Sequence, residues 1–146
     1  MENNLQNIHG TTVQIEDYGV LLLGVAGAGK SDLALRLIDH GAQLVADDQT
    51  ILTLHKGLLW ASSPEKLQGL LEIRHVGIHQ LPFVETSPLA LAINLCQDPA
   101  ERLPEDQTIS YLSIDLPLYH LNPFEASTPA KIRILVEHIS RAKNAA

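Results

Sequence analysis

The stretch "YGVLLLGVAGAGKSD", residues 18–32, constrains the fold more than any other part of the chain. Residues 24–31 fit the pattern G-x-x-x-x-G-K-[ST], and an apolar run typical of a buried strand precedes them. Apolar residues then recur at 33, 34, 37 and 38, which predicts one face of a helix over residues 31–40, ending at Gly41. The order strand, glycine loop, helix predicts an α/β domain built around a phosphate-binding loop.

The residue types in this loop suit the phosphates of ATP. Glycines let main-chain N–H groups approach phosphate oxygens, and the start of the following helix adds partial positive charge. Lys30 can span the outer phosphates, and the Ser31 hydroxyl can ligate Mg²⁺. We therefore predict an ATP and Mg²⁺ site whose nucleotide-binding residues are Gly24, Gly27, Ala28, Gly29, Lys30, Ser31 and Asp32.

Two aspartates, Asp47 and Asp48, follow the predicted strand "AQLVA". In many phosphate-loop proteins a carboxylate at the end of a neighbouring strand holds the magnesium. Successive strand residues point to opposite faces, so one carboxylate can support the metal while the other accepts a proton from an incoming hydroxyl. The alternative interpretation is a polar turn that opens a hairpin.

The remaining patterns predict a mixed β-sheet and a C-terminal helix. We expect strands at 11–15 and 18–24, a hairpin over 50–62 turning at Gly57, a strand at 89–96 that buries Cys96, and strand material over 109–121 with a break near Pro117. Residues 62–88 are expected to be rich in loops. The last helix is predicted to be capped by Thr128, with one apolar face formed by Ile132, Leu135, Val136 and Ile139.

Length and charge limit the classes of partner. The 146 residues predict a single domain over 1–146. Seventeen acidic against ten basic residues give a net charge of −7, which argues against nucleic acid or an anionic membrane as the main partner. The sequence shows neither a signal-peptide pattern nor an apolar run of the ~20 residues that a membrane span needs, so we expect a cytoplasmic protein.

Three further stretches join the glycine loop in one ordered pattern: "IHG" at 8–10, "LVADD" at 44–48 and "LLEIRHVGI" at 70–78. The combination resembles the catalytic domain of the bacterial HPr kinase/phosphorylase. That resemblance implies a sheet and phosphate loop like those of phosphoenolpyruvate carboxykinase. It also implies a protein-serine kinase that uses ATP and Mg²⁺ and acts on HPr, the phosphocarrier of the sugar phosphotransferase system, or on an HPr-like protein.

The resemblance also implies roles for single residues. Lys30 and Ser31 would hold phosphate and metal, Asp48 would be the base for the substrate serine, Asp47 would assist at the metal, and His9 would lie close to the phosphates. Glu72 and Arg74 belong to the signature stretch at the mouth of the site, and Glu72 is a further candidate metal ligand. Without the resemblance, His9 is an ordinary surface histidine, and Glu72 and Arg74 are an exposed ion pair.

The sequence departs from the family pattern at three points. The sequence starts almost at "IHG", so we expect the usual N-terminal domain to be absent, and His75 stands where glycine is usual. Phe124 and Glu125, in "LNPFEAST", occupy a stretch where full-length members carry a P-G-R-N-like segment. Loss of that arginine removes a group that could hold inorganic phosphate, so we expect kinase activity rather than phosphorolysis. Family members form hexamers, which makes a hexamer the expected assembly.

Two other functions fit the same loop. A small-molecule kinase or NTPase would need an arginine-bearing lid, and the five arginines form no obvious lid cluster. A non-catalytic, ATP-sensing regulatory module would have less need of Lys30, Ser31 and Asp48 together.

Overall fold

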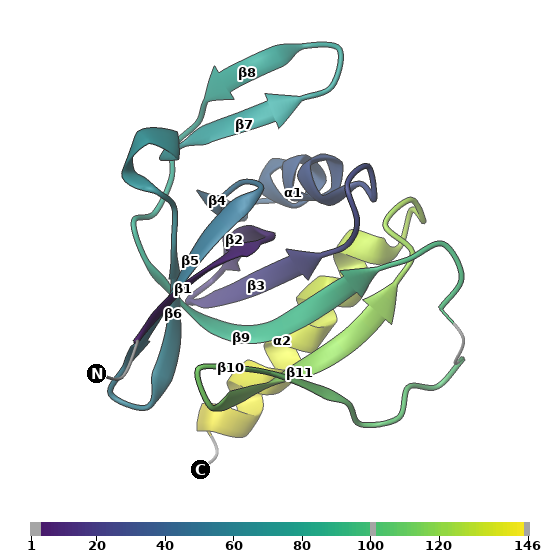
Figure 1. The fold of residues 1–146 in the computed structure, drawn as a ribbon. Coiled ribbons are helices and arrows are strands. Elements are labelled where there is room, and N and C mark those ends of the chain that lie inside the picture. Colours follow the sequence, from purple (N-terminus) through teal and green to yellow (C-terminus); the bar gives the residue numbers. More distant parts are fainter. Residues whose placement is uncertain (1–3, 100–101, 145–146) are drawn as a thin grey trace.

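A computed structural model of the chain describes residues 4–99 and 102–144 (Figure 1). The two α-helices are α1 (Lys30–Asp39) and α2 (Thr128–Asn144), and a short 3₁₀ helix, η1, spans Glu65–Leu67. The strands are β1 (Leu5–His9), β2 (Thr11–Ile15), β3 (Tyr18–Leu23), β4 (Gln43–Ala46), β5 (Gln49–His55), β6 (Leu58–Ser62), β7 (Leu70–Ile73), β8 (Gly77–Gln80), β9 (Ser87–Leu95), β10 (Thr108–Tyr111) and β11 (Ile114–Leu121).

The described strands form one curled mixed sheet and a separate hairpin, β7–β8. The order in the large sheet is β1-β5-β6-β9-β3-β2-β4, with β11 on β9 and β10 on β11. β3, β9 and β11 run parallel to one another, whereas the other pairs are antiparallel. This confirms the predicted mixed sheet. Because the three parallel strands end at the same edge, the loops that follow them lie together there (Figure 1).

Two bent arms of the chain run antiparallel to each other. β1 pairs with β5 and β2 pairs with β4, and both arms bend at the same level, at Gly10 in one and at Asp47–Asp48 in the other. The Gly10 N–H donates to the Asp48 carbonyl across the bend, with 2.9 Å between N and O. The aspartate pair is therefore fixed where one strand ends and the next begins.

The strand periodicity of two divides the apolar residues of the sheet between two clusters. On β3, Val20 and Leu22 pack with α1 and α2, whereas Leu21 faces the other cluster with β5 and β6. The predicted face of α2 is confirmed, because Ile132 and Val136 are buried and Leu135 and Ile139 pack against them. Both helices thus cover the same face of the sheet, and α1 starts at the edge where β3 ends.

The structure corrects the prediction for residues 62–88. A 3₁₀ turn and the β7–β8 hairpin occupy the middle of that segment, and every residue of β8 is exposed. β8 is exposed throughout and only Leu71 of β7 is fully buried, so no alternating apolar pattern revealed the hairpin. β1 was also missed, because its exposed pattern likewise gives no apolar face.

Three local predictions were wrong in position. The break expected near Pro117 lies at Leu112 and Ser113, which both have positive φ (50° and 67°), and Pro117 lies inside β11. Cys96 is half-buried and follows β9. The Thr128 hydroxyl donates to the Asn122 carbonyl, so it anchors the preceding loop, where a cap on α2 was expected. Within the described residues, no helix has the length and apolar character that crossing a membrane requires.

Candidate functional site

The loop between β3 and α1, residues 24–29, is here called the glycine loop. Gly29 adopts a left-handed conformation (φ 99°) ahead of α1, and among the described residues no side chain caps the start of that helix. Its first N–H groups therefore remain available to an anion. The Lys30 ammonium donates to the carbonyl oxygens of Gly24, at 2.8 Å, and Val25, at 3.1 Å. The start of the loop is thus held to the Lys30 ammonium.

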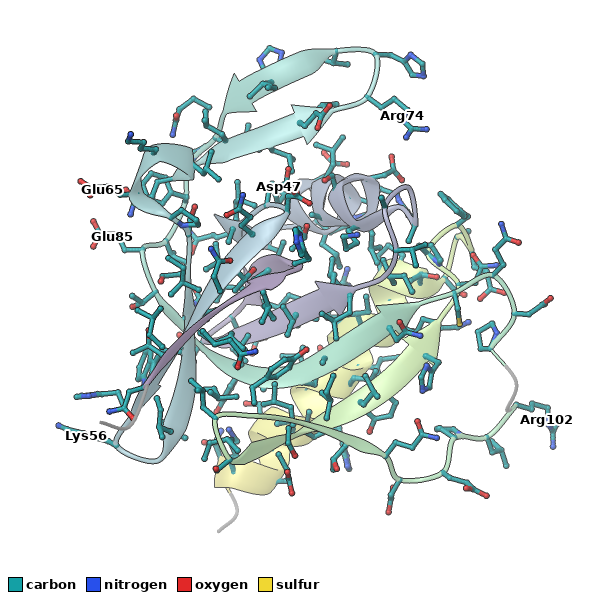
Figure 2. The ribbon with its side chains drawn as sticks, in the orientation of Figure 1. Asp47, Lys56, Glu65, Arg74, Glu85 and Arg102 are labelled. Carbon is teal, nitrogen blue, oxygen red and sulfur yellow. The ribbon has the colours of Figure 1, made fainter. Side chains whose placement is uncertain are left out.

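The Asp47 carboxylate, at the end of β4, contacts three other elements: α1, β2 and β7. Its Oδ1 accepts hydrogen bonds from Ser31 Oγ at 2.7 Å and from Thr11 Oγ1 at 3.0 Å. Its Oδ2 accepts the main-chain N–H of Glu72 at 3.3 Å. The end of β4, the first turn of α1 and the β7–β8 hairpin therefore meet at one carboxylate (Figure 2).

Asp48 has a fixed backbone and a free carboxylate. It has φ 66°, and the Gln49 N–H donates to the Asp47 carbonyl at 2.7 Å across it, which forms a tight γ-turn. The Asp48 N–H donates to Thr11 Oγ1 at 3.1 Å. The side chain is exposed and makes no hydrogen bond or ion pair to any described residue. Asp48 thus combines a strained backbone with a side chain that is open to solvent. Backbone strain of this kind is typical of functional sites.

The signature residues lie on the β7–β8 hairpin. Glu72 contacts Asp47 through its main chain, and its carboxylate is exposed. Arg74 lies in the turn at the end of the hairpin (Figure 2), and no ion pair joins the two side chains in the described structure. His75, next to it, has φ 70°, a conformation that favours the glycine usual at this position.

His9 is exposed at the end of β1, opposite Gln49 and one residue before the Gly10 contact to Asp48. Its position is therefore adjacent to the aspartate bend. The arrangement brings His9, Asp48, Asp47 and Ser31 into one region of the sheet edge. Asp32, also predicted to bind nucleotide, forms an exposed ion pair with Arg36 at 3.1 Å between Nε and Oδ2.

The donor set suits magnesium held jointly with phosphates. Among the described residues, no three His, Cys, Asp or Glu side chains are grouped to hold a metal by themselves. Mg²⁺ is commonly bound by one or two protein oxygens together with waters and substrate phosphates. Ser31 Oγ and Asp47 Oδ1, 2.7 Å apart beside the glycine loop, provide such oxygens. Of the three predicted ligands, Glu72 reaches this pair only through its N–H.

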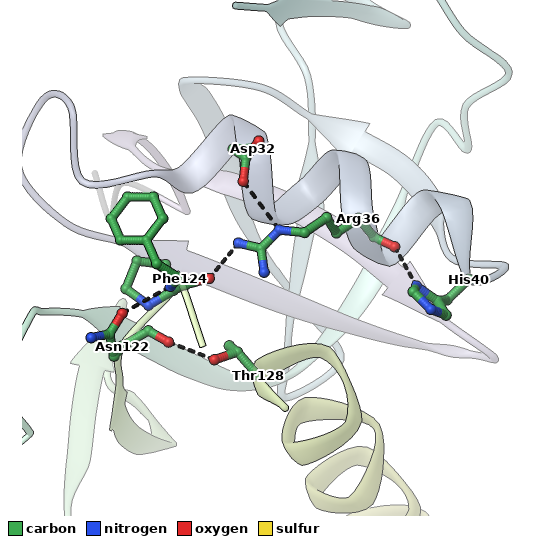
Figure 3. A network of polar contacts seen from close by, with 7 residues as sticks. Asp32, Arg36, His40, Asn122, Phe124 and Thr128 are labelled. Carbon is green, nitrogen blue, oxygen red and sulfur yellow. Dashed lines mark hydrogen bonds and ion pairs between the residues drawn. The ribbon is translucent and has the colours of Figure 1, made fainter. Parts of the chain in front are cut away.

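Sequence reasoning missed two contributors to the site. Thr11 is fully buried and bonds to both aspartates, but only the pairing of β2 with β4 reveals it. The second is the loop between β11 and α2, residues 122–127, here called the β11–α2 loop. Arg36 Nη2 donates to the Pro123 carbonyl, and Phe124 lies against Gly29 (Figure 3). The sequence feature that could have pointed to this loop is its departure from the family pattern at Phe124 and Glu125.

Comparison with known proteins gives a consistent match. Residues 3–121 match the sequence model described as HPr Serine kinase C-terminal domain. HPr kinase/phosphorylase of Clostridium tetani is 35% identical over 74% of this chain, and that of Bordetella pertussis is 36% identical over 89%. The alignments cover 36% and 46% of those relatives, so the chain spans less than half of their length.

A solved structure agrees in fold. The HPr(Ser) kinase/phosphatase from Coxiella burnetii superposes with a TM-score of 0.82 at 30% sequence identity. The superposition covers 96% of this chain and 93% of that one. The mixed α/β architecture with a curled sheet and a C-terminal helix is therefore shared.

Proposed function

Because the chain belongs to the HPr serine kinase C-terminal domain family, we propose that it is a protein-serine kinase acting on an HPr-like phosphocarrier protein. ATP would be the phosphoryl donor, and Mg²⁺ would be the metal. The observation that carries the proposal is the 2.7 Å contact between Ser31 Oγ and Asp47 Oδ1. It places a hydroxyl and a carboxylate together at the start of α1, where a phosphate loop needs its metal ligands.

The glycine loop would bind the nucleotide. Main-chain N–H groups at the uncapped start of α1 would face the phosphates, and the helix dipole would add partial positive charge. Lys30, now bonded to Gly24 and Val25, would exchange those carbonyls for phosphate oxygens. Ser31 and Asp47 would hold Mg²⁺, which neutralises charge on the outer phosphates when bound.

Asp48 would serve the acceptor serine. The bond between the γ-phosphorus and the β,γ-bridging oxygen would break, and a bond from the serine oxygen to that phosphorus would form. The serine proton would pass to the Asp48 carboxylate. This carboxylate is exposed and has no hydrogen-bond or ion-pair partner among residues 4–99 and 102–144, which supports the assignment, since a protein substrate must reach it from solvent. Asp47 already has three donors and fits the metal role better.

The remaining candidates surround this centre. His9 precedes the backbone contact between Gly10 and Asp48, which supports a place near the phosphates. Glu72 connects the β7–β8 hairpin to Asp47, and Arg74 is presented at the hairpin's turn. We propose that the hairpin borders the approach of the acceptor protein and that Arg74 contacts either the acceptor or the transferring phosphoryl group.

We propose that the forward kinase reaction is much faster than phosphorolysis. Glu125 forms an ion pair with Lys131, at 2.9 Å between Oε1 and Nζ, in the stretch where an arginine is usual. An acidic group there disfavours inorganic phosphate. Assembly into a hexamer is likewise proposed from the family resemblance, and light scattering of the purified chain tests it.

The test is a transfer assay that follows ATP and protein together. The purified chain, Mg²⁺ and ATP are incubated with the HPr-like proteins of the host, and both ATP consumption and protein-bound phosphate are measured. Labelled acceptor supports the proposal. ATP consumption without labelled protein would indicate a small-molecule kinase or NTPase instead, and ATP binding without consumption would indicate a sensing module.

A further inference from the structure

We propose that the exposed ring of Phe124 is the stacking platform for the nucleobase of the bound nucleotide. This inference rests on the nucleotide binding proposed above and extends it by assigning a base-binding residue. The family match ends at Leu121, so the β11–α2 loop that carries Phe124 lies outside the matched residues.

The topology gives the direction of the nucleotide. The glycine loop follows β3, and the β11–α2 loop follows β11, at the same edge of the sheet. Asp47 follows β4, on the opposite side of β3 from β9 and β11. In open sheets, ligands bind outside the carboxyl ends of parallel strands. With its outer phosphates beside Ser31 and Asp47, a nucleotide extends its base toward the β9–β11 side.

Phe124 lies against the glycine loop on that side. A methyl group at Gly29 would be 3.1 Å from Phe124 Cζ and 3.2 Å from Cε1, so the edge of the ring rests on the Gly29 backbone. The side chain nevertheless remains 61% exposed. An aromatic ring packed at its edge and open on its face suits base stacking, because every base has a π-face.

The backbone beneath the ring is held from both sides (Figure 3). The Phe124 N–H donates to Asn122 Oδ1 at 2.8 Å, and Arg36 Nη2 donates to the Pro123 carbonyl. The Thr128 hydroxyl donates to the Asn122 carbonyl, which fixes the start of the loop. A platform held in this way loses little conformational freedom when a ligand stacks on it.

The charges nearby favour a neutral planar group over a second phosphate. Among the described residues, the two basic side chains that contact the β11–α2 loop already have acidic partners: Arg36 pairs with Asp32 at 3.1 Å, and Lys131 pairs with Glu125 at 2.9 Å. Arg36 and Lys131 therefore offer no unpaired positive charge to an anion beside the ring. The carboxylates of Asp32 and Glu125 repel anions there. The ring is therefore suited to the base end of the nucleotide.

The experiment compares ATP with inorganic tripolyphosphate, which has the phosphates without the base. Isothermal titration calorimetry in Mg²⁺ measures both affinities for the wild type, Phe124→Ala and Phe124→Trp. We expect Phe124→Ala to weaken ATP binding about 5- to 100-fold, the effect of losing one base–aromatic stack. Tripolyphosphate affinity should stay unchanged, and Phe124→Trp should retain ATP affinity and show fluorescence quenching by ATP but not by tripolyphosphate.

Three outcomes would overturn the inference. Equal losses of both ligands in Phe124→Ala would mean that the ring supports the glycine loop, and no loss of either would mean that it touches no ligand. In both cases the wild type still binds ATP, so nucleotide binding itself stands. A wild type that binds neither ligand would overturn the proposed nucleotide site, and the stacking role with it.

Discussion

Ser31 Oγ lies 2.7 Å from Asp47 Oδ1, a contact that joins the first turn of α1 to the end of β4. The two residues come from separate stretches of sequence, and the pairing of β2 with β4 and with β3 brings them together. Thr11, on β2, donates to the same oxygen at 3.0 Å. Ser31 and Asp47, the proposed metal ligands, are thus positioned by a buried threonine on β2, the strand between β3 and β4.

Replacement of Thr11 tests that positioning. Thr11→Val removes one donor to Asp47 and leaves the Asp48 N–H without its partner, so we expect about 1–3 kcal/mol lower unfolding free energy. It should also raise the Mg²⁺ concentration needed for half-maximal activity. Urea unfolding and a Mg²⁺ titration measure the two effects.

The matched control is Thr12→Val, the same change one residue along β2. Thr12 bonds to Thr50, which keeps a second partner in the Gly10 carbonyl, and neither residue touches an aspartate side chain. We expect this variant to keep the wild-type Mg²⁺ requirement. Equal shifts in the two variants would contradict the positioning role of Thr11.

Asp48→Asn separates catalysis from backbone strain. Asparagine tolerates the left-handed φ of 66°, so the γ-turn should persist. The amide cannot accept the serine proton, and we expect phosphoryl transfer to slow by about 10²–10⁴-fold. ATP affinity, measured by calorimetry, should not change. Wild-type transfer by this variant would remove Asp48 from the proposed mechanism.

Gly29→Ala tests the packing between the glycine loop and the β11–α2 loop. The added methyl group meets both a φ of 99° and the Phe124 ring, 3.1 Å away. Gly41→Ala is the control, because Gly41 has a similar φ of 107° and no atom near the added methyl group. We expect both to lose about 1–2 kcal/mol to backbone strain. Gly29→Ala should lose more, and equal thermal shifts would argue against the ring contact.

His75 tests the hairpin turn that bears the signature residues. Its φ of 70° suits glycine and disfavours a β-branched residue. We expect His75→Gly to keep the β7–β8 hairpin and His75→Val to open it. Amide hydrogen exchange of Glu72, whose N–H bonds to Asp47, reports the difference. The prediction fails if the valine variant protects this amide as well as the glycine variant does.

The parts predicted from the sequence are those that depend on local chemistry. The glycines with Lys30 and Ser31 need particular backbone freedom and charge, and the apolar faces of both helices follow a fixed period. The hairpin over β5 and β6 turns through Lys56 and Gly57, whose positive φ values match the predicted turn at Gly57.

The parts that escaped prediction depend on pairing between distant segments. Thr11 acquires its role because β2 lies beside β4, and no local pattern records that pairing. The β7–β8 hairpin lacks an apolar period because β8 is exposed throughout, and its hydrogen bond to the site comes from a main-chain N–H. The sequence predicts that Thr128 caps α2, because it cannot show that the Thr128 hydroxyl donates instead to the Asn122 carbonyl.

The most direct test of the proposed kinase activity is the intact mass of the acceptor. After incubation with the chain, ATP and Mg²⁺, an HPr-like protein of the host should gain one phosphoryl group, ~80 Da, on a serine. Lys30→Ala and Asp48→Asn, each compared with the wild type at equal concentration, should abolish or strongly slow that gain. An unchanged acceptor mass with the wild-type chain, under conditions in which ATP is bound, would contradict the assignment.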